Sequence, residues 1–224
     1  MNIKIFQEDN YSNSIFCYIP NVLSLREQKN LLDYTNNINN FKYNPSYKNS
    51  KNGRLQKWFQ KDKKYFCPKW KKHYDWWCSF EYDKTITNLQ NFIQTFINTN
   101  KIINKYNIKK PKINSCLLNK YRNGNDYISP HRDTILSFGE EPTIIGLSLG
   151  QTRQINFKRV LNNNYSKSLS NLDKNKQDLN FSFELESGSI FIMAGSSQRF
   201  FSHSIPKSNT HNIRYSFTFR EFIL

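Results

Sequence analysis

The chain has 224 residues, with 33 Lys and Arg against 17 Asp and Glu, which gives a formal net charge of +16. A chain of this length can bury a hydrophobic core without a disulfide scaffold, and an aromatic content of 16% can supply much of that core, which excludes wholesale disorder. The positive charge favours a polyanionic partner such as nucleic acid, although the coding bias of an AT-rich genome would also enrich lysine.

The cysteines and the apolar segments indicate a reducing compartment and no membrane span. Cys17, Cys67, Cys78 and Cys116 form no CxxC pair and match no zinc or haem spacing. Polar and charged residues interrupt the start of the chain, and no apolar stretch approaches the roughly 20 residues of a membrane-spanning helix. We therefore expect an intracellular protein, cytoplasmic or nuclear, that is monomeric and does not enter a membrane.

Two amphipathic helices are expected in the first half of the chain. Ser24 with Glu27 three residues later is a capping-box signature, which predicts that a helix begins there after an approach segment. A second helix is expected from about Thr87, because apolar residues recur at the i, i+3, i+4, i+7 and i+8 positions of one face. These residues are Leu89, Phe92, Ile93, Phe96 and Ile97. Residues 36–53, rich in Asn, Lys and Ser, are expected to form a loop.

Short runs of β-branched and aromatic residues replace the helical pattern from Lys112 onward. Eight strands are predicted, at residues 113–122, 127–133, 143–150, 154–160, 181–186, 189–194, 200–205 and 212–221. Strands at this spacing predict a sandwich or jelly roll. Because the helices come before the strands, we expect an α+β protein with the helices packed against one sheet. Residues 161–180 are expected to form a solvated loop.

Two of the four histidines occupy positions that suggest a metal site. His131 and Asp133 are separated by one residue, so both side chains leave the same face of an extended backbone, and His203 lies on a later predicted strand. Two imidazoles and one carboxylate on one side of a metal form the facial triad of non-haem Fe(II) oxygenases. An HxD pair alone is more commonly a surface turn with a satisfied histidine. His211 is expected to be exposed in a loop.

The segment from Arg214 to Arg220 strengthens the prediction of a site. Arg214, Ser216, Thr218 and Arg220 alternate with three aromatic residues, so the two sets occupy opposite faces of a strand. Arginines along a buried face are costly unless an anion meets them. A dicarboxylate such as 2-oxoglutarate would do so through bidentate hydrogen bonds. The alternative is that these arginines pair with the chain's own acids or lie in solvent.

Six segments of the second half of the chain share their order with a known family. They are Asn119–Gly124, His131–Asp133, Ile145–Gly150 with Arg153, Gly188–Met193, Gln198–His203 with Pro206 and Lys207, and Arg214–Arg220. Through these segments the sequence resembles the AlkB family of Fe(II)/2-oxoglutarate-dependent dioxygenases, and is most similar to its eukaryotic nucleic-acid repair branch.

The resemblance implies the fold and the domain organisation. It implies a double-stranded β-helix, a jelly roll, with the N-terminal helices packed on one sheet and a nucleotide-recognition lid. We expect one dioxygenase domain over residues 1–224, with the helices and lid in residues 1–110 and the jelly-roll catalytic core in residues 111–224.

The resemblance also implies which residues form the site. His131, Asp133 and His203 would ligate the iron. The residues that would bind 2-oxoglutarate are Asn119, Tyr121, Arg214, Ser216 and Arg220. Among these, Asn119, Tyr121 and Arg214 would hold the distal carboxylate, and Arg220 would meet the carboxylate next to the keto group. No further catalytic residue is expected beyond these metal and co-substrate ligands.

The implied activity is the oxidative removal of N-methyl groups from nucleobases in DNA or RNA, as in alkylation repair. Fe(II), 2-oxoglutarate and O₂ would be required, with ascorbate as a reductant in vitro. An oxidised N-methyl group becomes an unstable hemiaminal that loses formaldehyde. One alternative is an oxygenase of the same fold that acts on a protein or another non-nucleic-acid substrate. A third is a nucleic-acid-binding module with an inactive iron site, which the intact set of site residues argues against.

Two positions depart from the pattern of the resembled family. Ser216 stands where that family usually has Asn, and its hydroxyl can still donate a hydrogen bond. The second departure concerns the base: the family's repair enzymes place an acidic residue one or two positions after the iron-binding Asp, where this chain has Thr134 and Ile135. Glu140 or Glu141 could replace it, and the identity of the base stays open.

Residues 54–82 are where the resembled family places its nucleotide-recognition lid. All four tryptophans of the chain fall in this block, interleaved with lysines. Lysines can neutralise phosphates while aromatic rings stack on bases, and stacking favours a base that has left the helix. We predict substrate contacts from Trp58, Tyr65, Trp76, Trp77, Lys63, Lys64, Lys71 and Lys72. The alternative is a compact subdomain with the tryptophans as its core.

Overall fold

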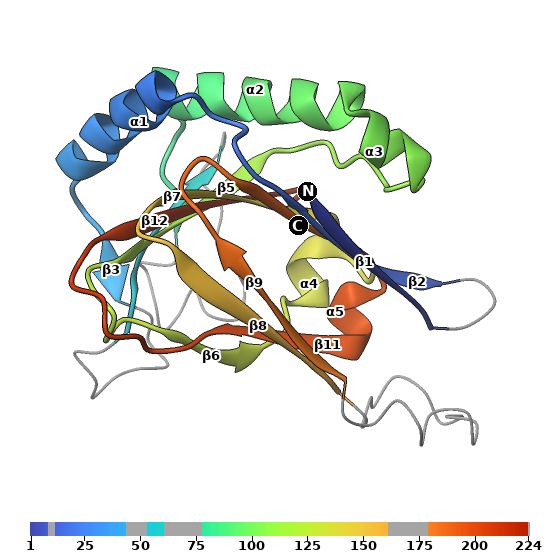
Figure 1. Cartoon of the computed structure of the whole chain (residues 1–224). Coiled ribbons are helices and arrows are strands. Elements are labelled where there is room, and N and C mark those ends of the chain that lie inside the picture. Colours follow the sequence, from blue (N-terminus) through green and yellow to red (C-terminus); the bar gives the residue numbers. More distant parts are fainter. Residues whose placement is uncertain (9–11, 44–52, 61–77, 161–178, 224) are drawn as a thin grey trace.

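A computed structural model describes residues 1–8, 12–43, 53–60, 78–160 and 179–223. Two antiparallel sheets face each other (Figure 1). The eight-stranded sheet has the order β1 (Asn2–Gln7), β2 (Asn13–Ile19), β10 (Ile190–Gly195), β7 (Ile144–Gly150), β12 (Arg214–Arg220), β5 (Ser115–Tyr121), β4 (Leu55–Gln60) and β3 (Lys42–Tyr43). The four-stranded sheet has the order β6 (Ile128–His131), β11 (Phe201–Ile205), β8 (Arg153–Arg159) and β9 (Asn180–Leu185). This arrangement confirms the predicted jelly roll.

The helices cover the outer face of the large sheet. α2 (Lys84–Thr99) runs across that face, with α1 (Leu25–Asn37) near one end of it and the short α3 (Lys101–Lys105) at the other (Figure 1). Of the one-turn helices α4 (Ile135–Phe138) and α5 (Ser197–Phe200), α5 packs against β2 and β10 of the large sheet and β11 of the small one. The predicted capping box at Ser24 and Glu27 is confirmed. α2 begins three residues earlier than expected, because the Asp83 side chain accepts a hydrogen bond from the backbone N–H of Ile86 and caps the helix there.

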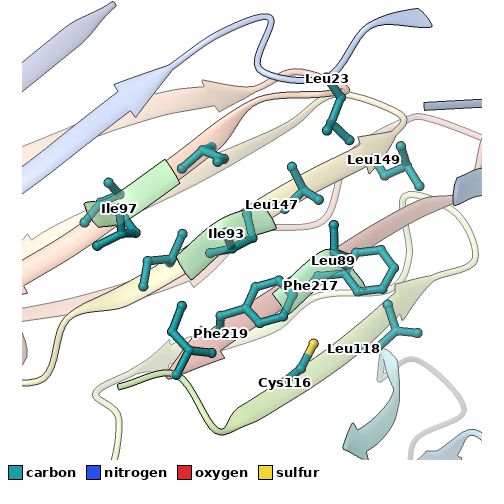
Figure 2. Packing of buried hydrophobic residues seen from close by; sticks show 14 of the residues in the cluster. Leu23, Leu89, Ile93, Ile97, Cys116, Leu118, Leu147, Leu149, Phe217 and Phe219 are labelled. Carbon is teal, nitrogen blue, oxygen red and sulfur yellow. The ribbon is translucent and has the colours of Figure 1, made fainter. Parts of the chain in front are cut away.

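The main core lies between α2 and the large sheet. Leu89, Ile93 and Ile97 of α2 point at Leu147 of β7 and at the aromatic residues of β12 (Figure 2). Alternation along β12 sends Tyr215, Phe217 and Phe219 into this core and the polar residues to the opposite face. A second cluster, rich in phenylalanine, occupies part of the space between the two sheets.

All eight strands predicted from residue 113 onward are confirmed, within a few residues at their ends. The strands of the N-terminal part were not predicted. β1 and β2 pair with each other, and β2 also pairs with β10. Paired residues of β2 and β10 are more than 170 positions apart in the sequence, so no local pattern predicts this pairing. The large sheet thus draws strands from both residues 1–110 and residues 111–224, and the division at residue 110 stays a prediction.

The block predicted as a lid begins with a core strand. β4 pairs with β5 over its whole length, so residues 55–60 belong to the large sheet. The predicted loop at 36–53 contains the end of α1 and the short β3; its residues 44–52, like 161–178 of the other predicted loop, lie outside the described residues. Within the described ranges, no helix has the length and apolar character needed to cross a membrane.

We expect Ile93→Ala to lower the free energy of unfolding by about 2–5 kcal/mol, because it removes a fully buried side chain and leaves a cavity under α2. Urea unfolding followed by circular dichroism measures the change. Asn91→Ala, on the exposed side of the same helix, is the control and should stay within about 0.5 kcal/mol of wild type. Equal losses from both substitutions would contradict the packing described here.

Candidate functional site

The register of two strands brings a pair of histidines together. β6 and β11 run antiparallel with His131 directly opposite His203, and the two ring centroids lie 4.2 Å apart. Asp133 follows two residues after His131. One potential ligand atom from each of the three residues lies within 4.8 Å of the others. Two imidazoles and a carboxylate in this arrangement could hold a divalent metal ion.

A local hydrogen bond orients His131, the half-buried histidine of this triad. The Nδ1 of His131 lies 2.9 Å from the carbonyl oxygen of Ser129, and a ring nitrogen that meets a carbonyl oxygen must carry the proton. The other nitrogen, Nε2, then keeps its lone pair, and it lies 3.7 Å from Oδ1 of Asp133. A backbone carbonyl that fixes the tautomer in this way is common behind metal-binding histidines.

Burial and neighbouring charges set the protonation of the triad. Burial lowers the pKa of His203 to about 3, so its imidazole is neutral at pH 7. Burial raises the pKa of Asp133, but positive charge beside the carboxylate, first of all the guanidinium of Arg220, lowers it by more, and the net shift is downward. Arg220 Nη2 lies 2.8 Å from Asp133 Oδ2. The triad therefore presents neutral imidazoles and an ionised carboxylate, the forms that bind metals.

The triad lies in a cavity of about 610 Å³ between the two sheets. This cavity collects every residue that was predicted to bind metal or co-substrate: His131, Asp133, His203, Asn119, Tyr121, Arg214, Ser216 and Arg220. The polar face of β12 forms one wall, and apolar side chains such as Phe191 and Met193 form part of another.

Arg214 is the most deeply buried cation of the cavity, with 2% of its surface exposed. Its Nε donates a hydrogen bond to Ser148 Oγ at 3.1 Å, and its guanidinium lies 5.1 Å from the ring centroid of Tyr121. Burial lowers the pKa of Arg214 to about 10, so it stays charged at pH 7. Its Nη1 has no hydrogen-bond partner among the described residues, and neither has Nε of Arg220.

Two residues of this cavity were missed in the sequence. Arg54 is 5% exposed, and its Nε donates to Asn119 Oδ1 at 2.7 Å. Gln56 donates to the same oxygen at 3.2 Å from the neighbouring strand. Both bonds occupy the Asn119 carbonyl and leave its amide N–H groups to act as donors. The signal was the alternation of Arg54, Gln56, Trp58 and Gln60 at period two, which marks one face of a strand.

The predicted substrate contact from Trp58 is wrong in this structure. Trp58 is 4% exposed, packs against Leu117, Phe138 and Phe222, and donates its indole N–H to Ser115 Oγ at 2.7 Å. A buried ring with a satisfied N–H is a core residue and has no face left for a base. The other predicted contacts lie outside the described residues: Tyr65, Trp76, Trp77, Lys63, Lys64, Lys71 and Lys72.

The two glutamates considered as replacements for a missing acid lie outside the cavity. Glu140 lines a neighbouring cavity that shares Asp133 and Thr134 with the first. Glu141 is exposed and lies 3.9 Å from Arg199. Neither lines the cavity of the triad, whereas Thr134 does.

Comparison with known proteins gives a family and several relatives. The model of the 2OG-Fe(II) oxygenase superfamily matches residues 16–220. The chain is 30% identical over 118 residues to the DNA oxidative demethylase ALKBH2 of Arabidopsis thaliana. This match covers 49% of this chain and 38% of the relative. The chain is 31% identical over 108 residues to the alpha-ketoglutarate-dependent dioxygenase alkB homolog 3 of Homo sapiens, covering 48% and 36%. The matches thus span less than half of these curated relatives.

Solved structures share the fold. The structure of OsALKBH1 superposes with a TM-score of 0.61 at 14% identity, covering 97% of this chain and 100% of that chain. A prolyl hydroxylase from Trichoplax adhaerens, in complex with a hypoxia inducible factor peptide, gives a TM-score of 0.52 at 15% identity, covering 92% and 83%. These structures show the fold, and the curated relatives bear out the resemblance to the AlkB family.

His131→Ala should weaken the binding of Mn²⁺ by more than about tenfold. Mutating a residue that only hydrogen-bonds to a metal ligand lowers metal affinity roughly 10–100-fold, and removing the ligand itself should cost at least as much. Isothermal titration of the purified protein measures the affinity. His211→Ala is the matched control, because His211 is exposed and outside the cavity, and it should bind like wild type. An unchanged Mn²⁺ affinity in the His131 variant would contradict metal binding by this triad.

Proposed function

The chain belongs to the 2OG-Fe(II) oxygenase superfamily, and from this premise we propose that it oxidatively removes N-methyl groups from bases of DNA or RNA. One observation carries the proposal: a His–Asp–His triad and two buried arginines with unpartnered nitrogens share one cavity, in a chain similar to proteins named as a DNA oxidative demethylase and an alkB homolog. The net charge of +16 supports a polyanionic substrate.

His131, Asp133 and His203 are the proposed iron ligands. The donor set fits the metal, because two nitrogens and one carboxylate oxygen suit Fe(II) and leave other coordination positions open. The superfamily description itself names Fe(II) and 2-oxoglutarate. When bound, the iron and its co-substrate supply the oxidation of a C–H bond by O₂, with release of CO₂ and succinate.

The buried arginines fit a dicarboxylate co-substrate. Arg214 with Asn119, Tyr121 and Ser216 would hold the distal carboxylate of 2-oxoglutarate, and Arg220 would meet the carboxylate next to the keto group. The unpartnered Nη1 of Arg214 and Nε of Arg220 support this, since a buried cation is costly until an anion completes its hydrogen bonds.

The remaining cavity walls would position the substrate and keep water out. Ile155, Phe191 and Met193 line the cavity with apolar surface, and such a lining limits competing reactions with solvent. An N-methyl carbon oxidised there would become an N-hydroxymethyl group, which releases formaldehyde and leaves the unmethylated base.

The proposal extends to the setting in which the enzyme acts. A nucleic-acid demethylase would work in the nucleus or the cytoplasm, and we propose that it does so as a monomer.

One assay tests the proposed activity. The protein is incubated with Fe(II), 2-oxoglutarate, ascorbate and a pool of methylated DNA and RNA oligonucleotides, while mass spectrometry follows each modified nucleoside and succinate is measured in parallel. We expect the loss of a methylated base matched by an equal amount of succinate. Succinate without base loss would point to an oxygenase of another substrate, such as a protein, and would contradict the nucleic-acid proposal.

Arg214→Met should raise the KM for 2-oxoglutarate by about 10–100-fold, because a charge-assisted hydrogen bond to a buried carboxylate is worth roughly 1.5–3 kcal/mol. Arg214→Lys should recover part of the loss, since it restores the charge without the planar fork. Arg26→Met, on the exposed side of α1, is the control and should leave KM unchanged. Equal KM values for wild type and Arg214→Met would place the co-substrate elsewhere.

A further inference from the structure

The cavity holds far more positive than negative charge. Its lining includes four guanidinium groups, from Arg54, Arg132, Arg214 and Arg220. Among the residues that the structure describes, Asp133 is the only carboxylate that lines it. That carboxylate already pairs with Arg220 at 2.8 Å. If a divalent metal ion and a dicarboxylate bind together, their charges cancel, and the surplus positive charge of the lining residues remains.

Three acids within the described ranges lie close to the cavity but outside its lining. Glu141 pairs with Arg199 at 3.9 Å. Glu140 lines the neighbouring cavity together with Arg132 and Arg199. Asp126 is buried and is held by Arg122 at 2.7 Å. Glu141 and Asp126 are thus each paired with an arginine, and none of the three acids belongs to the lining of the triad's cavity.

Part of the rim beside the triad is apolar. Leu136 lines the cavity and is 57% exposed. Pro130 is exposed beside it in the same lining. The hydroxyl oxygen of Thr134 accepts a hydrogen bond from the backbone N–H of Leu136 at 3.3 Å. Leu136 and Pro130 thus offer apolar surface to a flat uncharged ring, and Glu140, which lines the adjoining cavity together with Leu136, does not line this one.

We infer that the site selects neutral N-methylated bases, such as 3-methylthymine, 3-methyluracil or 1-methylguanine, over the cationic 1-methyladenine and 3-methylcytosine. The inference rests on the proposed demethylase function and names its substrate class. A cationic base that entered the cavity would lose its hydration and meet a surplus of like charge, which costs free energy that a neutral base is spared. Selection of this kind arises from repulsion of the wrong substrate as much as from attraction of the right one.

The test uses oligonucleotides of one sequence that differ only in the methylated base. We expect kcat/KM with Fe(II) and 2-oxoglutarate to be at least about tenfold higher for the neutral bases, the ratio that corresponds to roughly 1.4 kcal/mol. Fluorescence anisotropy with the metal-free protein should give the same order of affinity, because the surplus charge belongs to the chain. A preference for the cationic bases in both measurements would overturn this inference and leave the demethylase function standing. Turnover of no base would overturn both.

Leu136→Glu tests the electrostatic origin directly. A carboxylate at this exposed position should raise the ratio of cationic to neutral turnover by about tenfold, the effect of one charge-assisted contact. Leu136→Gln is the matched control, with the same shape and no charge, and should leave the ratio within about twofold of wild type. Equal melting temperatures confirm that both variants fold. The same ratio in both variants would show that charge does not set the choice of base.

Discussion

The placement of buried positive charge is the constraint on which this structure depends. Arg54, Arg214 and Arg220 are at most 6% exposed, yet they face one cavity. Removing such ions from water costs several kcal/mol each unless partners replace the lost hydration. The fold supplies part of that replacement through the hydroxyl of Ser148, the carbonyl of Asn119 and the carboxylate of Asp133. The positive charge left over suits the cavity to an anion such as a dicarboxylate and, on our inference, disfavours a cationic base.

One strand connects this electrostatic arrangement to the stability of the fold. The aromatic face of β12 packs into the core beneath the helices, and Tyr215 also donates a hydrogen bond to Asn36 of α1 at 2.9 Å. The opposite face carries Arg214 and Arg220 into the cavity. Because both faces belong to one backbone, the packing of α1 and α2 on the outside fixes the position of the arginines inside. The pairing of β6 with β11 does the same for the two histidines.

The features that could be predicted from the sequence are those that depend on a pattern of nearby residues. Alternation at period two predicted β12 and its two faces, and a capping box predicted the start of α1. The HxD spacing with a later histidine indicated the triad. The alternation, the capping box and the HxD pair each depend on neighbours within a few residues, whereas His203 was assigned through the resemblance to a known family. The fold class followed from the spacing of the strands in the second half of the chain.

The features that could not be predicted depend on pairing between distant segments. β2 finds its partner β10 across most of the chain, and β4 carries Arg54 and Gln56 to Asn119 only because it pairs with β5. The same pairing explains the error at Trp58. Its aromatic and basic surroundings in the sequence resemble a binding surface, whereas its partners in space, Phe138 and Phe222, make it core.

The central claim is that the surplus charge of the cavity receives a dicarboxylate beside a metal-bound triad. A crystal structure of the protein with Mn²⁺ and 2-oxoglutarate, prepared without oxygen, tests it most directly. We predict the metal on His131, Asp133 and His203, with one carboxylate of 2-oxoglutarate on Arg214 and the other end of the molecule at the metal. A metal bound elsewhere, or Arg214 left without an anion in the presence of saturating 2-oxoglutarate, would contradict the claim.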